Sequence, residues 1–239
     1  MVGTLTGISS MATRAVLAEL AEAYTASTGV RVDITSVGGV DAARRITAGE
    51  TFDTVILASD ALDKLIAAGH VQPGRVDLVR SPVALAVRSG SLHPDVSTEA
   101  ALKQAVLAAP ALGYSTGPSG NHLAALFARW GIADQVRERI VVPPPGVPVG
   151  QLVADGRVAL GFQQLSELIS LPDIDVLGLL PPGAEFITTF SAGVAAVSPH
   201  GDAVRAMLAY MASPEADAAK QRHGMAPARD DLFIQETTP

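Results

Sequence analysis

The sequence predicts an α/β protein of two lobes, each a doubly wound, mainly parallel sheet flanked by helices. Three observations support this prediction. The amino-terminal part of the chain alternates strand-like and helix-like patterns in a β-α-β-α-β order. The segment FDTVILAS is a nearly continuous apolar run, as expected for a parallel strand that is buried on both faces. A second alternating series then begins at STEAALKQAVLAA.

Hydrophobic periodicity predicts the elements of the amino-terminal part in turn. Strands are predicted at VGTLTGI, VRVDITS and FDTVILAS. Helices are predicted at MATRAVLAELAEAYTAST, from Asp41 onward, and at ALDKLIAAG. Gly29 follows the first helix at the position where a left-handed residue favours termination.

The next part of the chain is predicted in the same way. RVDLVRSPVALAVRSG reads as two short strands divided by Pro82. Further strands are predicted at ALGYS, RVALGF, DIDVLGLL and ITTFSAGVAAVS. Helices are predicted at STEAALKQAVLAA, after the turn TGPSG, at GVPVGQLVAD, and as a pair with a Ser-Pro break in GDAVRAMLAYMASPEADAAKQRHG.

Composition excludes several classes of function. The 239 residues carry a formal net charge of −7, which argues against a nucleic-acid partner because phosphate contacts need a basic face. No apolar run is long enough to cross a bilayer. The absence of cysteine excludes disulfides and thiolate metal sites. No leader follows Met1, which fits either a cytoplasmic protein or a mature exported protein whose leader has been removed.

The candidate ligand site follows from the predicted sheets. Each half has a Gly/Ser turn after one of its strands, and such turns precede helix N-termini that can bind anions. SVGGVDAARRI contains the first turn and TGPSGNH the second. Ligands of open α/β sheets bind beyond the carboxyl ends of the strands, so the cleft between the two lobes is the expected site.

Six blocks of the sequence resemble one family, in order and spacing over nearly the whole chain. They are GISSM, SVGGVDAARRI, FDTVILASDALDKLIAAGHV, YSTGPSG, GVPVGQLVADGRVALGFQQLSEL and ASPEADAAKQRHGM. The chain thus resembles the periplasmic binding proteins of the molybdate-binding type, the solute receptors of certain ABC transporters. This resemblance implies a two-lobed clamshell of the type II class, with residues 1–88 and 187–239 in lobe 1 and 89–186 in lobe 2.

The resemblance also implies ligand contacts, because this family holds tetrahedral oxyanions with serine hydroxyls and backbone N–H groups. The implied contacts are Ser9 or Ser10, the Gly38–Gly39 turn, Ser119, the backbone at Pro148–Val149, and Gln163. Two departures favour an organic carboxylate over molybdate. The sequence has Val37-Gly38-Gly39 where molybdate binders favour a serine beside the glycine, and Gln163 where they often have a tyrosine.

Further contacts are candidates from their chemistry, each beside a structural alternative. Ser9 and Ser10 can also be plain helix caps. Arg44 or Arg45 can bind a carboxylate with a bidentate fork, but adjacent helical positions point about 100° apart, so at most one faces the site. Thr116, Ser119 and the backbone to Gly120 can form a donor cluster ahead of a helix.

Two functions from different classes remain. One is a receptor for a small anion, which would pass its ligand to an ABC permease. The other follows from a narrower resemblance to isomerases of this family that interconvert trans- and cis-aconitate by an allylic proton shift. That reaction needs a base, and the candidates are His122, Tyr114 and Glu167, with His122 first because the ordinary imidazole pKa is nearest neutrality. Either function predicts a periplasmic monomer with a small anionic ligand, preferably a tricarboxylate, and no metal or cofactor.

Overall fold

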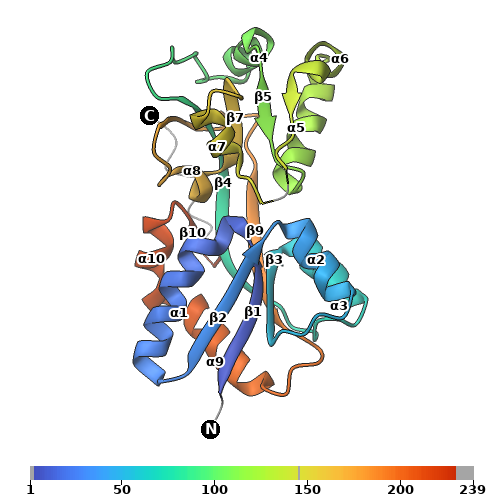
Figure 1. Ribbon diagram of the computed structural model, residues 1–239, viewed down its shortest axis with the longest axis vertical. Helices are drawn as coiled ribbons and strands as arrows, with labels where there is room; N and C mark the ends of the chain where they lie inside the picture. Colours follow the sequence, from blue (N-terminus) through green and yellow to red (C-terminus); the bar gives the residue numbers. More distant parts are fainter. Residues whose placement is uncertain (1–2, 145, 230–239) are drawn as a thin grey trace. The chain divides into compact units, whose positions relative to one another are not determined.

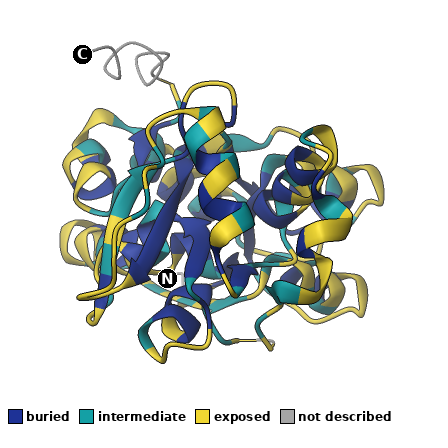
Figure 2. Cartoon of the chain, turned by 90° about the horizontal axis from the view of Figure 1, so that it is seen from above, coloured by how far each residue is buried: buried dark blue, intermediate teal, exposed yellow. Residues whose placement is uncertain are grey.

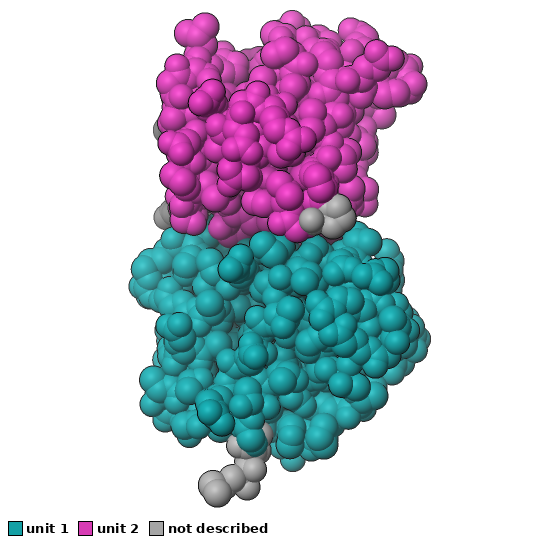
Figure 3. All heavy atoms as spheres, viewed as in Figure 1, with its two compact units in different colours: residues 1–81, 189–239 teal, residues 82–188 magenta. Residues whose placement is uncertain are grey.

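The computed structural model describes residues 3–144 and 146–229. The chain divides into two compact units, residues 1–81 with 189–239 as unit 1 and residues 82–188 as unit 2 (Figure 3). Strands β4 (Val76–Arg88) and β9 (Ile187–Val194) each run from one unit into the other. The predicted first lobe extends to residue 239, and its last ten residues lie outside the described part of the chain.

Unit 1 is built on a sheet whose central strands are parallel (Figure 1). Strand β1 (Thr4–Ser10) lies between β2 (Arg31–Val37) and β3 (Thr54–Ala58), and β3 pairs antiparallel with β9. The remaining elements are η1 (Met11–Thr13), α1 (Arg14–Thr28), α2 (Gly39–Thr47), α3 (Ser59–Ala67), α9 (Gly201–Ala212), η3 (Pro214–Ala216), α10 (Asp217–Arg222) and β10 (Ala226–Pro227).

Helices cover both faces of this sheet because its strands alternate apolar side chains between two cores. Leu5 and Ile56 point into a core shared with α1 and α9. Val55 and Leu57, the neighbours of Ile56, point into a second core shared with α2 and α3. This period-two alternation explains why β3 is apolar at every position.

Unit 2 repeats the arrangement on a second set of strands. Strand β5 (Leu112–Tyr114) pairs in parallel with β6 (Ile140–Val141) and β7 (Leu160–Gln164), and β4 pairs antiparallel with β7 and β8 (Ile174–Leu179). Its helices are α4 (Glu99–Ala108), α5 (Pro118–Arg129), α6 (Ala133–Val136), η2 (Arg137–Arg139), α7 (Val149–Ala154) and α8 (Leu165–Leu168).

The core of unit 2 is likewise divided between the two faces of its sheet. Leu102, Phe127 and Phe162 belong to the core on the side of α4 and α5. Val149 and Leu168 belong to the opposite core, which α7 and α8 cover. In Figure 2 the central strands are largely dark blue, whereas the outer faces of the helices are yellow. The predicted alternation of strands and flanking helices is therefore observed in both units.

The prediction that Pro82 divides two strands is wrong, because β4 runs without a break from Val76 to Arg88. Proline fits an extended backbone and costs a strand only one N–H donor. Hydrogen bonding resumes at once, since the N–H of Val83 donates to the carbonyl of Phe186 at 2.9 Å. The second predicted helix also begins earlier than expected, at Gly39 instead of Asp41.

Candidate functional site

In unit 1, the predicted serines lie at the carboxyl end of β1. Ser9 is paired with Ser36 across the parallel strands, and their hydroxyl oxygens are 2.8 Å apart. Ser10 is the next residue and is also buried, but its hydroxyl oxygen has no hydrogen-bond partner among the described residues. A buried hydroxyl without a partner is costly unless something else satisfies it. The Ser10 hydroxyl, at the carboxyl end of β1, is therefore available to donate a hydrogen bond to a ligand.

The Gly38–Gly39 turn lies beside this serine. Helix α2 begins at Gly39, and a Cβ added there would lie 3.7 Å from the Cβ of Ser10. The first N–H groups of a nine-residue helix thus open next to the unpartnered hydroxyl. A hydroxyl donor beside a helix N-terminus is the arrangement that binds an anion without a positive side chain.

Arg44 and Arg45 are both engaged in ion pairs on the outside of unit 1. Arg44 pairs with Asp41, one turn earlier in α2, and its side chain is 71% exposed. Arg45 pairs with Glu50 and lies over the ring of Phe52 at 5.6 Å. The partners of the two guanidinium groups are thus Asp41 and Glu50, not Ser10. The role of Arg44 and Arg45 as ligand contacts stays a prediction.

In unit 2, the TGPSG turn brings several predicted residues together. The hydroxyl oxygens of Ser115 and Ser119 are 3.3 Å apart, with Ser119 buried in the first turn of α5. Gly120 allows this approach, because a Cβ at that position would lie 1.6 Å from the carbonyl oxygen of Ser115. Thr116 is exposed at the start of the turn.

The two aromatic candidates for the base have different surroundings. Burial raises the pKa of the Tyr114 phenol, whose ring packs edge-on against Phe127 with centroids 6.0 Å apart. His122 stacks on Phe186 at 4.4 Å, and its Nε2 is 3.1 Å from the carbonyl oxygen of Ala184. The His122 side chain is thus tied to the segment before β9.

The third candidate, Glu167, belongs to a buried network at the end of β7. Nε2 of Gln163 donates to Oε1 of Glu167 at 2.8 Å, and Oε1 of Gln163 accepts from the N–H of Gly150 at 2.9 Å. Gly150 is the second residue of α7, directly after the predicted backbone contact at Pro148–Val149. Burial raises the pKa of Glu167 to about 7, against the lowering effect of the Gln163 hydrogen bond.

The sequence analysis did not single out three participants in these clusters, namely Ser36, Ser115 and Gly150. All three lie within the motifs SVGGVDAARRI, YSTGPSG and GVPVGQLVAD, which were already candidate parts of the site. Their roles depend on contacts between separate elements, which spacing within one motif does not report.

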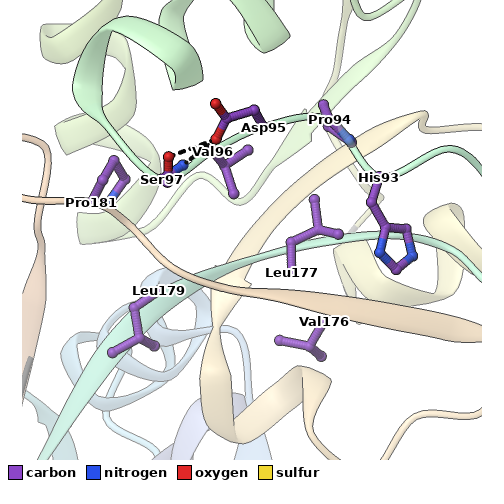
Figure 4. Close-up of a pocket in the computed structure, with 9 residues that line it drawn as sticks. All are labelled: His93, Pro94, Asp95, Val96, Ser97, Val176, Leu177, Leu179 and Pro181. Atoms are coloured by element: carbon purple, nitrogen blue, oxygen red, sulfur yellow. Dashed lines mark hydrogen bonds between the residues drawn. The ribbon is translucent and has the colours of Figure 1, made fainter. Parts of the chain in front are cut away.

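A shallow pocket elsewhere on unit 2 is lined by none of the predicted site residues. It has a volume of about 400 Å³ and is lined largely by apolar side chains of β8 and of the segment before α4 (Figure 4). The carboxylate of Asp95 at its rim already accepts from the N–H and hydroxyl of Ser97. Across residues 3–144 and 146–229, no group of three or more His, Asp or Glu side chains is placed to hold a metal ion.

Comparison with known proteins connects this geometry to a family. A profile described as bacterial extracellular solute-binding protein matches residues 5–226. The chain belongs to this family. The chain is also 40% identical over 235 residues to a curated protein from Pseudomonas sp named aconitate isomerase, a match that covers 95% of this chain and 88% of that protein.

Solved structures confirm the predicted periplasmic-binding-protein fold. The molybdate-binding protein of Azotobacter vinelandii superposes with a TM-score of 0.78 at 20% identity, over 93% of this chain and 98% of that one. The sulfate-binding protein of Mycobacterium tuberculosis H37Rv has a TM-score of 0.78 at 19% identity, over 97% and 89%. At such identities the likeness shows the fold alone. Within the described part of the chain, no helix is long and apolar enough to cross a membrane.

Proposed function

We propose that this protein is an isomerase that interconverts trans- and cis-aconitate by an allylic proton shift. The observation that carries the proposal is Glu167, a carboxyl group with a pKa of about 7 that accepts a hydrogen bond from Gln163. A group that titrates near neutrality can both take up and return a proton at physiological pH. The name of the 40% identical relative from Pseudomonas sp supports aconitate as the substrate.

The reaction balances with one base. A proton leaves the methylene carbon of aconitate, and the carbanion charge spreads through the double bond into the neighbouring carboxylates. A proton then returns to the former vinylic carbon, so that the double bond moves by one position and the other isomer forms. No atom or electron is gained or lost overall, so the proposed reaction needs no oxidant or reductant.

Glu167 is the preferred base among the three candidates. The raised pKa of Tyr114 leaves very little phenolate at neutral pH. The side chain of His122 is already engaged by the carbonyl of Ala184 and the ring of Phe186. Glu167 in contrast belongs to the network at the carboxyl end of β7, the edge of a parallel sheet where ligands bind.

Neutral donors are proposed to bind the substrate carboxylates. In unit 1 these are the Ser10 hydroxyl and the first N–H groups of α2. In unit 2 they are the hydroxyls of Ser115 and Ser119 at the start of α5. Such donors also stabilise the charge that develops on the carboxylates when the proton leaves.

A non-catalytic receptor for a small anion is the second candidate, favoured by the unpartnered Ser10 hydroxyl at a helix N-terminus. A receptor needs only such donors and would deliver its ligand to an ABC permease. For either function we propose a periplasmic location, in keeping with the extracellular family description, and a monomer that prefers a tricarboxylate.

Proton NMR of trans-aconitate in D2O with a catalytic amount of protein separates the two functions. An isomerase produces growing cis-aconitate signals. An unchanged spectrum over hours, together with calorimetric binding of aconitate or molybdate, would reject the isomerase and favour the receptor.

The variant Glu167→Gln tests the base. It should bind aconitate yet lose turnover by roughly 10²–10⁴-fold, the usual contribution of a general base. Asp173→Asn, which changes an exposed acid shortly after α8, is the matched control and should keep turnover. Full activity of Glu167→Gln, with loss of activity in His122→Ala, would move the role of base to His122.

A further inference from the structure

We propose that Gln163 is a positioning residue that orients the Glu167 carboxylate and favours its ionised form. This inference rests on the proposed function, in which Glu167 is the base. The sequence analysis had placed Gln163 among the ligand contacts. Both polar ends of its side chain are instead occupied within unit 2, by Gly150 and Glu167.

The orientation of the Gln163 amide is fixed by the group that it meets on α7. The N–H of Gly150 can only donate, so the atom that faces it at 2.9 Å must be the amide oxygen. The NH2 group then points to Glu167, 2.8 Å away. The side chain of Gln163 is buried at 3% exposure, which limits competition from water for either bond.

Gly150 permits this contact through close packing of α7 on the segment around α8. A Cβ at residue 150 would lie 2.4 Å from Cδ1 of Leu171 and 3.0 Å from Cδ2 of Leu168. A larger residue would force the side chains of Leu171 and Leu168 to shift. The Gln163 amide is therefore held between α7 and α8: its oxygen accepts from Gly150, and its NH2 group donates to Glu167.

Burial has the largest effect on the pKa of Glu167 and raises it, whereas the hydrogen bond from Gln163 lowers it. Helix α8 packs against β7 and β8, and the only titratable side chain on these strands is Asp175. The Asp175 carboxylate is engaged by His93, Ser89 and Gly90. Helix α7 carries no titratable group. An NH2 group can only donate, so it stabilises the carboxylate and not the acid proton.

The matched variants Gln163→Met and Gln164→Met test this role. Methionine keeps the length of the side chain without its hydrogen bonds. Gln164 is the neighbouring buried amide, and its Nε2 donates to the hydroxyl of Thr188, not to Glu167. Titration of the Glu167 side-chain carbon by ¹³C NMR, in protein labelled on Glu, reports the ionisation without any need for turnover.

We expect Gln163→Met to raise the Glu167 pKa by about one to two units, the equivalent of a hydrogen bond to a charged group. The acidic limb of kcat against pH, where the base becomes protonated, should move to higher pH by the same amount, while KM for aconitate stays close to that of the wild type. Gln164→Met should leave the Glu167 titration in place. If Gln163→Met does not fold, Gln163→Asn, one methylene shorter, should shift the titration in the same direction.

An unchanged Glu167 titration in a folded Gln163 variant would overturn the inference. A tenfold or greater rise of KM without a change of the titration would also overturn it and return Gln163 to the ligand contacts. If the titration shifts while the wild-type protein never converts aconitate, the proposed function fails but the control of Glu167 by Gln163 holds.

Discussion

Ser9 and Ser10 are adjacent residues with opposite surroundings, which makes them a sensitive probe of the anion site. Ser9 is satisfied by Ser36, whereas Ser10 has no partner among the described residues. Ser10→Ala removes no hydrogen bond, so it should leave the unfolding temperature unchanged or slightly higher. It should weaken aconitate binding roughly ten- to hundredfold, because a hydroxyl that donates to a charged ligand group contributes about 1.5–3 kcal/mol.

Isothermal titration calorimetry and thermal unfolding of Ser10→Ala and Ser9→Ala measure both effects. Ser9→Ala should lower the stability by about 1 kcal/mol through the loss of its bond to Ser36. Wild-type affinity in Ser10→Ala would exclude Ser10 from the ligand contacts.

At this scale the sequence predicted which residue types gather at strand ends, because the parallel-sheet rule places them there. Ser10 is the last residue of β1, and Ser119 and Glu167 lie within five residues of the ends of β5 and β7. The network of Gln163 with Gly150 could not be predicted, since it depends on how closely α7 packs on the sheet. The same holds for the engagement of His122 by Ala184.

At the scale of elements, the position of α5 depends on one missing side chain. A Cβ at Gly120 would overlap the carbonyl oxygen of Ser115 and would touch the Tyr114 ring at 3.1 Å. Gly120→Ala should therefore displace the helix and lower the free energy of unfolding by about 1–3 kcal/mol, as overpacking does. Gly117→Ser is the control, because a Cβ there meets only the Ser115 hydroxyl at 3.8 Å. Equal urea midpoints for both variants would contradict this account.

Elements with a clear period were predictable, and those whose limits depend on other segments were not. Gly29 ends α1 with φ +75°, as its sequence position predicts. Strand β4 continues through Pro82 because Val83 finds Phe186 as a partner, about a hundred residues away in the chain. A proline alone predicts a break, and only the neighbouring segment decides whether one occurs.

For the whole molecule, carboxylates that accept hydrogen bonds in the folded state make the free energy of unfolding fall at low pH. Burial raises the pKa of Asp53, but hydrogen bonds from Ser198 and Thr6 outweigh this and hold the pKa below its usual value. A carboxyl of this kind contributes stability at neutral pH that is lost as the pH falls through the folded-state pKa. The effect of Glu167 on stability changes with pH in the opposite direction, because its pKa is raised in the folded state.

Glu167 should therefore stabilise the fold at acidic pH and lose that contribution as the pH rises. The folded protein keeps the Glu167 proton up to a pH of about 7, whereas the unfolded chain releases it near the usual glutamate pKa of 4.5. Full ionisation of the folded state thus costs about 3 kcal/mol relative to a neutral side chain. Urea unfolding of Glu167→Gln and wild type should give a difference that grows by about this amount between pH 4 and pH 8, in favour of the variant. A difference that is independent of pH would mean that Glu167 ionises as easily in the folded protein as in the unfolded chain, and the carboxyl would then lack the neutral-pH proton exchange that the proposed reaction requires.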